Sequence, residues 1–157
     1  MPPRVYIETS IVSYLVARPS AEPLLAADQR RTREWWAASR AVADLYTSEF
    51  VVTEAQRGDP VMAARRVDHL SRMTLLYPDL RATSLADALV ERGPLPASAT
   101  MDASHIALAA VYGMDYLLTW NCKHIANEKM RPTIERICQA HGFIAPILCT
   151  PAQLTGG

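Results

Sequence analysis

The chain has 157 residues, of which sixteen are basic and sixteen acidic, and half of its residues are hydrophobic. This composition excludes a disordered or fibrous protein, and the balanced charge gives no reason to expect strong non-specific attraction to polyanions. The length is typical of one compact domain, so we expect residues 1–157 to form a single domain. Cys122, Cys138 and Cys149 have no C-x-x-C spacing, which favours reduced thiols over disulfides or a thiolate zinc site.

The sequence contains no pattern that would place the protein in a membrane. No run approaches the roughly 18 apolar residues of a spanning helix. The first residues, Met-Pro-Pro-Arg, lead directly into a strand-like run without the apolar core of a signal peptide. We therefore expect a cytoplasmic protein.

The first half of the chain alternates short apolar runs with amphipathic segments. Residues 5–7 predict a strand, and a hydroxyl just after it can cap the next helix. Residues from 22 to about 45 predict an amphipathic helix or helix pair. Residues 45–47 predict a second strand, followed by a helix that Ser48 can cap and that ends at Gly58.

The second half continues this alternation. The predicted elements are a helix over 60–72, a strand over 74–77, a helix over 86–91, a helix from Ser98 or Thr100 to Gly113, a strand over 116–119, a helix over 132–140 that stops before Gly142, and a strand over 147–149. Strands alternating with helices predict the α/β class, with a parallel sheet of about four to five strands covered on both faces. Ligands of such sheets bind beyond the carboxyl ends of the strands.

Glu8, Glu54 and Asp102 occupy positions where an acid is unexpected or lies near such an edge. Glu8 directly follows the first strand, although its position taken alone favours a first-turn acid that the helix dipole stabilises. Glu54 falls on the apolar stripe of its helix, with pairing to Arg57 as the alternative. Asp102 begins a helix and is open to the same dipole explanation as Glu8. Jointly they predict a cation site, because converging carboxylates require a counter-charge.

Asn121 follows the strand at 116–119, so its amide oxygen can also reach this edge, or it can form an Asx turn. The histidines lack zinc-protease or zinc-finger spacing, and each is predicted to lie on a helix surface or to be hydrogen-bonded. They are His69, His105, His124 and His141. Nucleophile-elbow, dinucleotide-binding and P-loop motifs are absent from the sequence. A carboxylate site for a hard cation is what remains.

Several short segments follow one another in a specific order and spacing. They are Val5-Tyr6-Ile7-Glu8-Thr9-Ser10, Val52-Thr53-Glu54-Ala55, Asp102-Ala103-Ser104-His105-Ile106-Ala107, Leu117-Leu118-Thr119-Trp120-Asn121, Lys123-His124-Ile125-Ala126-Asn127, and Cys149-Thr150-Pro151 with Leu154. With these segments the chain resembles the PIN-domain family, and specifically the VapC-like toxins and their close relatives, over nearly its whole length. The resemblance implies a Rossmann-like parallel sheet and magnesium- or manganese-dependent cleavage of RNA.

The resemblance also implies roles for individual residues. Glu8 matches the family's first acid, which is usually aspartate, and Glu54 and Asp102 match the second and third. These residues would hold the metal. Asn121 falls where many relatives have a fourth aspartate, so we expect it in the catalytic centre beside one tightly held metal, a second being recruited only by substrate phosphate.

Further groups follow from the same resemblance. Thr9 and Thr119 match hydroxyl positions that orient the metal's ligands or water, and Arg57, Lys123 and His124 are candidates for contact with substrate phosphates. The family implies an endoribonuclease toxin of a type II toxin-antitoxin pair, with a homodimeric state and a small antitoxin partner. Two alternatives stay open: an RNA-processing nuclease without an antitoxin, and a catalytically silent RNA- or protein-binding module.

Overall fold

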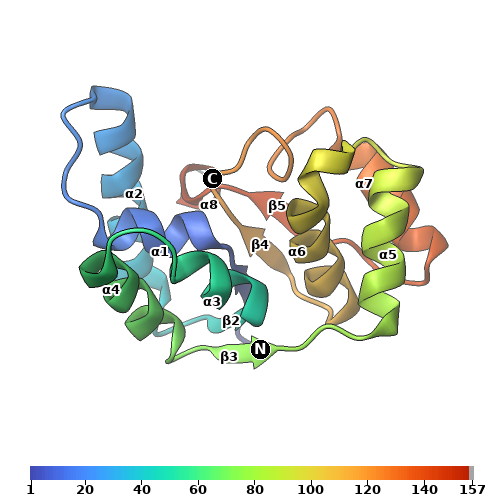
Figure 1. Ribbon diagram of the computed structural model, residues 1–157, viewed down its shortest axis with the longest axis horizontal. Helices are drawn as coiled ribbons and strands as arrows, with labels where there is room; N and C mark the ends of the chain where they lie inside the picture. Colours follow the sequence, from blue (N-terminus) through green and yellow to red (C-terminus); the bar gives the residue numbers. More distant parts are fainter. Residues whose placement is uncertain (156–157) are drawn as a thin grey trace.

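The computed structural model describes residues 1–155, and within them five parallel strands form one sheet in the order β3-β2-β1-β4-β5 (Figure 1). The strands are β1 Arg4–Ile7, β2 Asp44–Ser48, β3 Thr74–Leu76, β4 Tyr116–Leu118 and β5 Ile147–Cys149. The helices are α1 Thr9–Val16, α2 Pro23–Ser39, α3 Glu49–Ala55, α4 Pro60–Leu70, α5 Leu80–Glu91, α6 Thr100–Val111, α7 Arg131–Ala140 and α8 Pro151–Thr155, with a 3₁₀ turn at Ala97–Ala99. The expected α/β class with a parallel sheet is confirmed.

The helices lie in two groups, α1 to α4 on one side of the strands and α5 to α7 on the other (Figure 1). The chain builds the sheet outward from β1 to β2 and β3, then returns to add β4 on the other side of β1. Because parallel crossovers are right-handed, this reversal moves the later helices to the opposite face. The carboxyl edge between β1 and β4 is therefore the point where the strand order reverses, which is the place where such sheets bind ligands.

The central strands are apolar on both faces because helices cover both. Ile7 of β1 and Leu117 and Leu118 of β4 are fully buried, as is Ile106 of α6. Burial of one such side chain contributes about 1.5–3 kcal/mol to folding. The rigid centre of the sheet therefore lies directly beneath the residues that follow β1 and β4.

Glycines end the helices where the sequence predicts. Gly58, after α3, has a φ of 85°, and Gly113 and Gly142 also have positive φ. This left-handed conformation is strained for residues with a Cβ atom, and it lets the chain turn away from the helix axis. Gly58 thus fixes the end of the helix that carries Glu54.

Two predicted helix boundaries are wrong. The helix expected over 22–45 ends at Ser39, because the backbone carbonyl of Ser39 accepts from Val42 and Ala43 in a turn and Asp44 then joins the sheet through Pro3. The helix expected over 86–91 begins at Leu80, where the Asp79 side chain accepts from the third amide after it. In both cases a local polar contact sets the boundary.

Three further observations concern helix α8, the cysteines and the length and apolar character of the helices. Helix α8 was not predicted. All three cysteines are free thiols, which confirms the expectation of no disulfide. Within residues 1–155, no helix combines the length and the apolar character that crossing a membrane requires.

Candidate active site

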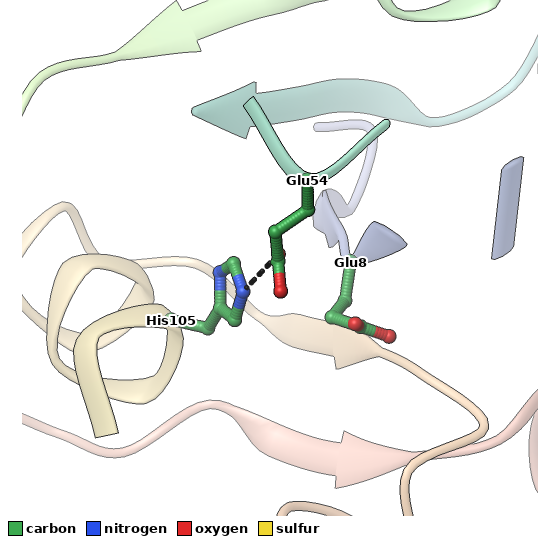
Figure 2. Close-up of side chains that lie close together, drawn as sticks. All are labelled: Glu8, Glu54 and His105. Carbon is green, nitrogen blue, oxygen red and sulfur yellow. Dashed lines mark hydrogen bonds and ion pairs between the residues drawn. The ribbon is translucent and has the colours of Figure 1, made fainter. Parts of the chain in front are cut away.

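Side chains from three separate elements meet at the carboxyl edge of the sheet. Glu8 follows β1, Glu54 lies on α3 and His105 lies on α6, and each offers one potential ligand atom within 4.8 Å of the others (Figure 2). Glu8 and Glu54 carry like charges, so their proximity favours a cation between them. The predicted convergence therefore holds for Glu8 and Glu54, and it includes a histidine that was not predicted.

Glu8 is a buried carboxylate that is held through one of its oxygens. Its Oε1 accepts from the Ser10 backbone amide at 3.1 Å and from the Thr119 hydroxyl at 2.6 Å, and it also accepts from the Ser10 hydroxyl. Glu8 itself caps α1, which corrects the expectation that a hydroxyl does so. No donor within the described residues contacts Oε2. A role of Glu8 at the start of α1, through Oε1, is thus compatible with a role as a metal ligand, through Oε2.

Glu54 is held in the same one-sided way. Its Oε1 accepts from the Thr9 hydroxyl at 2.6 Å and from His105 Nε2 at 2.9 Å. Burial raises the pKa of Glu54, but the hydrogen bonds from His105 and Thr9, together with electrostatic attraction to His105 and Arg57, outweigh burial and lower the pKa below its ordinary value. The described ion pairs do not include the alternative pairing with Arg57. Glu54 is therefore a carboxylate held in its charged form.

His105 is fully buried between Glu54 and Tyr6. Its Nδ1 lies 2.7 Å from the Tyr6 hydroxyl, which lies 2.7 Å from Ser48 Oγ. The sequence predicted only a surface or hydrogen-bonded histidine here, and the hydrogen-bonded alternative is correct. A signal was present, because His105 lies three residues after Asp102 and so shares its face of α6. A sequence signal also existed for Tyr6. It lies two residues before Glu8, and alternation along an extended chain places both side chains on the same side.

Asp102 and Asn121 belong to a second group of contacts, centred on His124. Asp102 Oδ2 lies 3.0 Å from His124 Nδ1, and Asn121 Oδ1 accepts from the His124 backbone amide at 3.0 Å. Asp102 is not part of the three-residue group at Glu8. The Asn121 contact forms the Asx turn that was the alternative expectation for this residue. The backbone amide of Asn121 also donates to Thr119 Oγ1 at 2.9 Å. Thr119 therefore connects the two groups.

The remaining predicted residues lie around this centre. Thr9 and Thr119 each donate to one of the two glutamates. Arg57 is exposed just beyond the end of α3, and Lys123 is exposed beside His124 in the connection between β4 and α7. Their positions leave both cationic side chains accessible to a ligand.

Comparisons with known proteins address the fold. No protein-family model matches the chain, and no curated protein matches it. A chain in the crystal structure of VapBC2 from Rickettsia felis bound to a promoter DNA fragment is 17% identical, with a TM-score of 0.52 over 76% of this chain and 89% of that one. VapC20 of Mycobacterium tuberculosis, a toxin that cleaves the sarcin-ricin loop, is 15% identical, with a TM-score of 0.55 over 90% of this chain and 99% of that one. The chain has a VapC-like PIN-domain fold. At these identities the similarity is one of fold, and it confirms the Rossmann-like architecture that the sequence resemblance implied.

Proposed function

We propose that the chain is a divalent-metal-dependent endoribonuclease that hydrolyses RNA phosphodiester bonds. The observation that carries the proposal is the convergence of Glu8 and Glu54 at the carboxyl edge of the sheet, each anchored through a single oxygen. Structural carboxylates usually satisfy both oxygens with protein donors or water, whereas a metal site needs one oxygen directed at the ion. A fold shared with a toxin that cleaves RNA supports RNA as the substrate class.

The donor set fits a hard cation. The Oε2 atoms of Glu8 and Glu54 receive no hydrogen bond from the described residues, and carboxylate oxygens are the ligands that Mg²⁺ and Mn²⁺ prefer. We propose Asp102 as the third ligand, since it occupies the first turn of α6 on the same face as His105. Asn121 supplies no charge, so the proposal is for one tightly held ion.

The chain's own residues prepare this centre. A bound Mg²⁺ or Mn²⁺ would supply an activated water and neutralise charge on the scissile phosphate. Thr9 and Thr119 hold the two glutamates in position by donating to their Oε1 atoms. We assign Asn121 to the catalytic centre, where its Oδ1 accepts from the backbone amide of His124 and holds that residue in position.

Substrate phosphates would meet the cationic groups beside the acidic edge. Arg57 follows the helix that carries Glu54, while Lys123 and His124 follow Asn121. Exposed arginine and lysine side chains suit phosphate oxygens, and such contacts orient a nucleic acid without reading its sequence. We assign these three residues to RNA binding.

A toxin role in a type II toxin-antitoxin pair is the form of this function that we propose. One structure with the same fold is of VapBC2 bound to a promoter DNA fragment, and this likeness supports a toxin-antitoxin pair here. The partner would be a small antitoxin, and the toxin would form a homodimer. A short antitoxin gene beside the gene for this chain, and copurification of the two products, would separate a toxin from an RNA-processing nuclease.

The proposal is tested by comparing Glu54→Gln with Glu49→Gln, an exposed acid on the same helix. We expect the first variant to lose Mn²⁺ binding in calorimetric titrations and to cleave labelled single-stranded RNA roughly 100-fold more slowly. Glu49→Gln should match the parent in both measurements. A parent protein that binds no Mn²⁺ and cleaves neither the labelled RNA nor total cellular RNA contradicts the proposal and supports the silent binding module.

A further inference from the structure

A chain of buried hydroxyl and imidazole groups runs through the core to Glu54. Ser48, Tyr6 and His105 are each fully buried. They come from the end of β2, from β1 and from α6 respectively. Burying polar side chains in a core is costly unless each is hydrogen-bonded, and here every one is. The chain connects the interior of the sheet with one carboxylate of the candidate active site.

With His105 in its neutral form, the hydrogen bonds of this chain have one consistent direction. Carboxylate oxygens accept hydrogen bonds, so Nε2 of His105 carries the hydrogen that it shares with Glu54 Oε1 at 2.9 Å. In the neutral imidazole Nδ1 then accepts, and the Tyr6 hydroxyl donates to it. Burial raises the pKa of Tyr6, which keeps its hydroxyl protonated. The Tyr6 oxygen remains free to accept from Ser48.

The His105 ring is also held by its aromatic neighbours. Phe50 meets it edge-on with ring centroids 6.3 Å apart, and the Tyr6 ring is tilted against it at 5.8 Å. A ring fixed by contacts on several sides keeps its Nε2 directed at one point. That point is Glu54 Oε1, which also accepts from Thr9.

We propose that His105 is a positioning residue that acts through Glu54 and is not itself a ligand of the metal. Tyr6 sets its tautomer, and the Nε2 hydrogen then fixes Oε1 of Glu54 so that Oε2 remains for the cation. Because both nitrogens of His105 are engaged, the ion meets oxygen ligands only, which favours Mg²⁺ and Mn²⁺ over Zn²⁺. The inference rests on the proposed function, whose metal site it refines.

Nitrogen NMR of the full chain with ¹⁵N-labelled histidine tests the tautomer directly, because protonated and unprotonated ring nitrogens resonate in separate ranges. We expect His105 to show an unprotonated Nδ1 and a protonated Nε2, and to keep that pattern at saturating Mg²⁺. Protonation of both nitrogens, or loss of the Nε2 hydrogen when Mg²⁺ binds, overturns the proposal.

Metal affinity provides the second test. Tyr6→Phe removes the donor to His105, and His105→Ala removes the donor to Glu54, so Mn²⁺ should bind about 10- to 100-fold more weakly in both. His105→Gln retains an amide donor and should recover part of the affinity that His105→Ala loses. Tyr46→Phe, a tyrosine substitution on the neighbouring strand, should bind Mn²⁺ like the parent. Unchanged Mn²⁺ affinity in folded Tyr6→Phe, checked by circular dichroism, overturns the proposal.

These measurements are independent of RNA cleavage. A protein that binds Mn²⁺ and shows the expected tautomer but cleaves no RNA would overturn the proposed function and leave the role of His105 standing. If the protein cleaves RNA and His105 ligates the metal, the proposed function stands and the role of His105 is overturned.

Discussion

The two groups of polar contacts at the carboxyl edge are built in different ways. Glu54 is positioned by His105, and His105 in turn by Tyr6, so its orientation is set by fully buried side chains of the sheet and its flanking helix. Asp102 and Asn121 instead contact His124, which lies in the stretch 119–130 between β4 and α7, where the structure has no helix or strand.

The difference teaches where preorganisation comes from in this protein. Groups fixed by the core lose little freedom when a ligand binds, because their rotamers are already restricted. Groups held by a connecting segment depend on that segment keeping its conformation. We therefore expect the glutamate pair to determine metal affinity. We expect the Asp102 group to affect the rate of RNA cleavage more than the metal affinity.

Asp102→Asn should show this division most clearly. The amide keeps the shape of the side chain, so the fold should persist, while RNA cleavage should fall roughly 100-fold or more. Mn²⁺ affinity should fall less than in Glu54→Gln, because the glutamate pair remains. The measurements are single-turnover cleavage and calorimetric Mn²⁺ titration, with the exposed Asp87→Asn as control. Cleavage at the parental rate would show that Asp102 is not part of the active site.

Thr119→Val breaks the connection between the two groups. The Thr119 hydroxyl donates to Glu8 and accepts from the Asn121 amide, and the residue is fully buried. Loss of a buried hydrogen bond to a charged group costs about 1.5–3 kcal/mol, and we expect roughly 10-fold weaker Mn²⁺ binding.

Urea denaturation and Mn²⁺ titration measure these effects, and Thr53→Val, on the exposed side of α3, is the matched control. If both threonine variants behave alike, the hydroxyl of Thr119 does not position Glu8.

The pH dependence of stability probes Glu54. Burial raises the pKa of Glu54, but His105, Thr9 and Arg57 together lower it more strongly, to below its ordinary value of 4.5. The charged form therefore contributes stability above pH 4.5, and this contribution is lost as the pH falls through the lowered value. Between pH 7 and pH 3 without metal, the free energy of unfolding should fall more steeply in the parent than in Glu54→Gln. Parallel curves for the two proteins would argue against a charged, hydrogen-bonded Glu54.

Thiol labelling compares the segment 119–130 with the core, and it needs no substitution in the protein. Cys122 is exposed beside Asn121, whereas Cys138 and Cys149 are buried, and burial raises the pKa of each buried thiol to about 11. At pH 8 iodoacetamide should modify Cys122 first, because only the thiolate reacts and the buried thiols hold little of it. Peptide mapping by mass spectrometry gives the order of modification. Equal rates at Cys122 and Cys138 would mean that the core opens readily.

Much of the fold was predictable because its signals are local. Apolar runs marked the strands, and glycines marked the ends of several helices, since Gly58 adopts a conformation that disfavours other residues. The errors arose where a side chain or backbone contact replaced a visible breaker, as at Ser39 and Asp79. Hydrophobic periodicity does not report such contacts.

The sequence by itself determined the α/β class, the parallel sheet and the placing of Glu8 and Glu54 near its carboxyl edge, because strand ends and helix starts follow from local patterns. Only the tertiary structure decided that His105 joins the glutamates, that Tyr6 holds it, and that Asp102 contacts His124. The physical reason is that these partners come from separate segments of the chain, which the sequence pattern does not place relative to one another. Their approach depends on strand order and crossover handedness, which bring β1 and β4 side by side and place α6 against them.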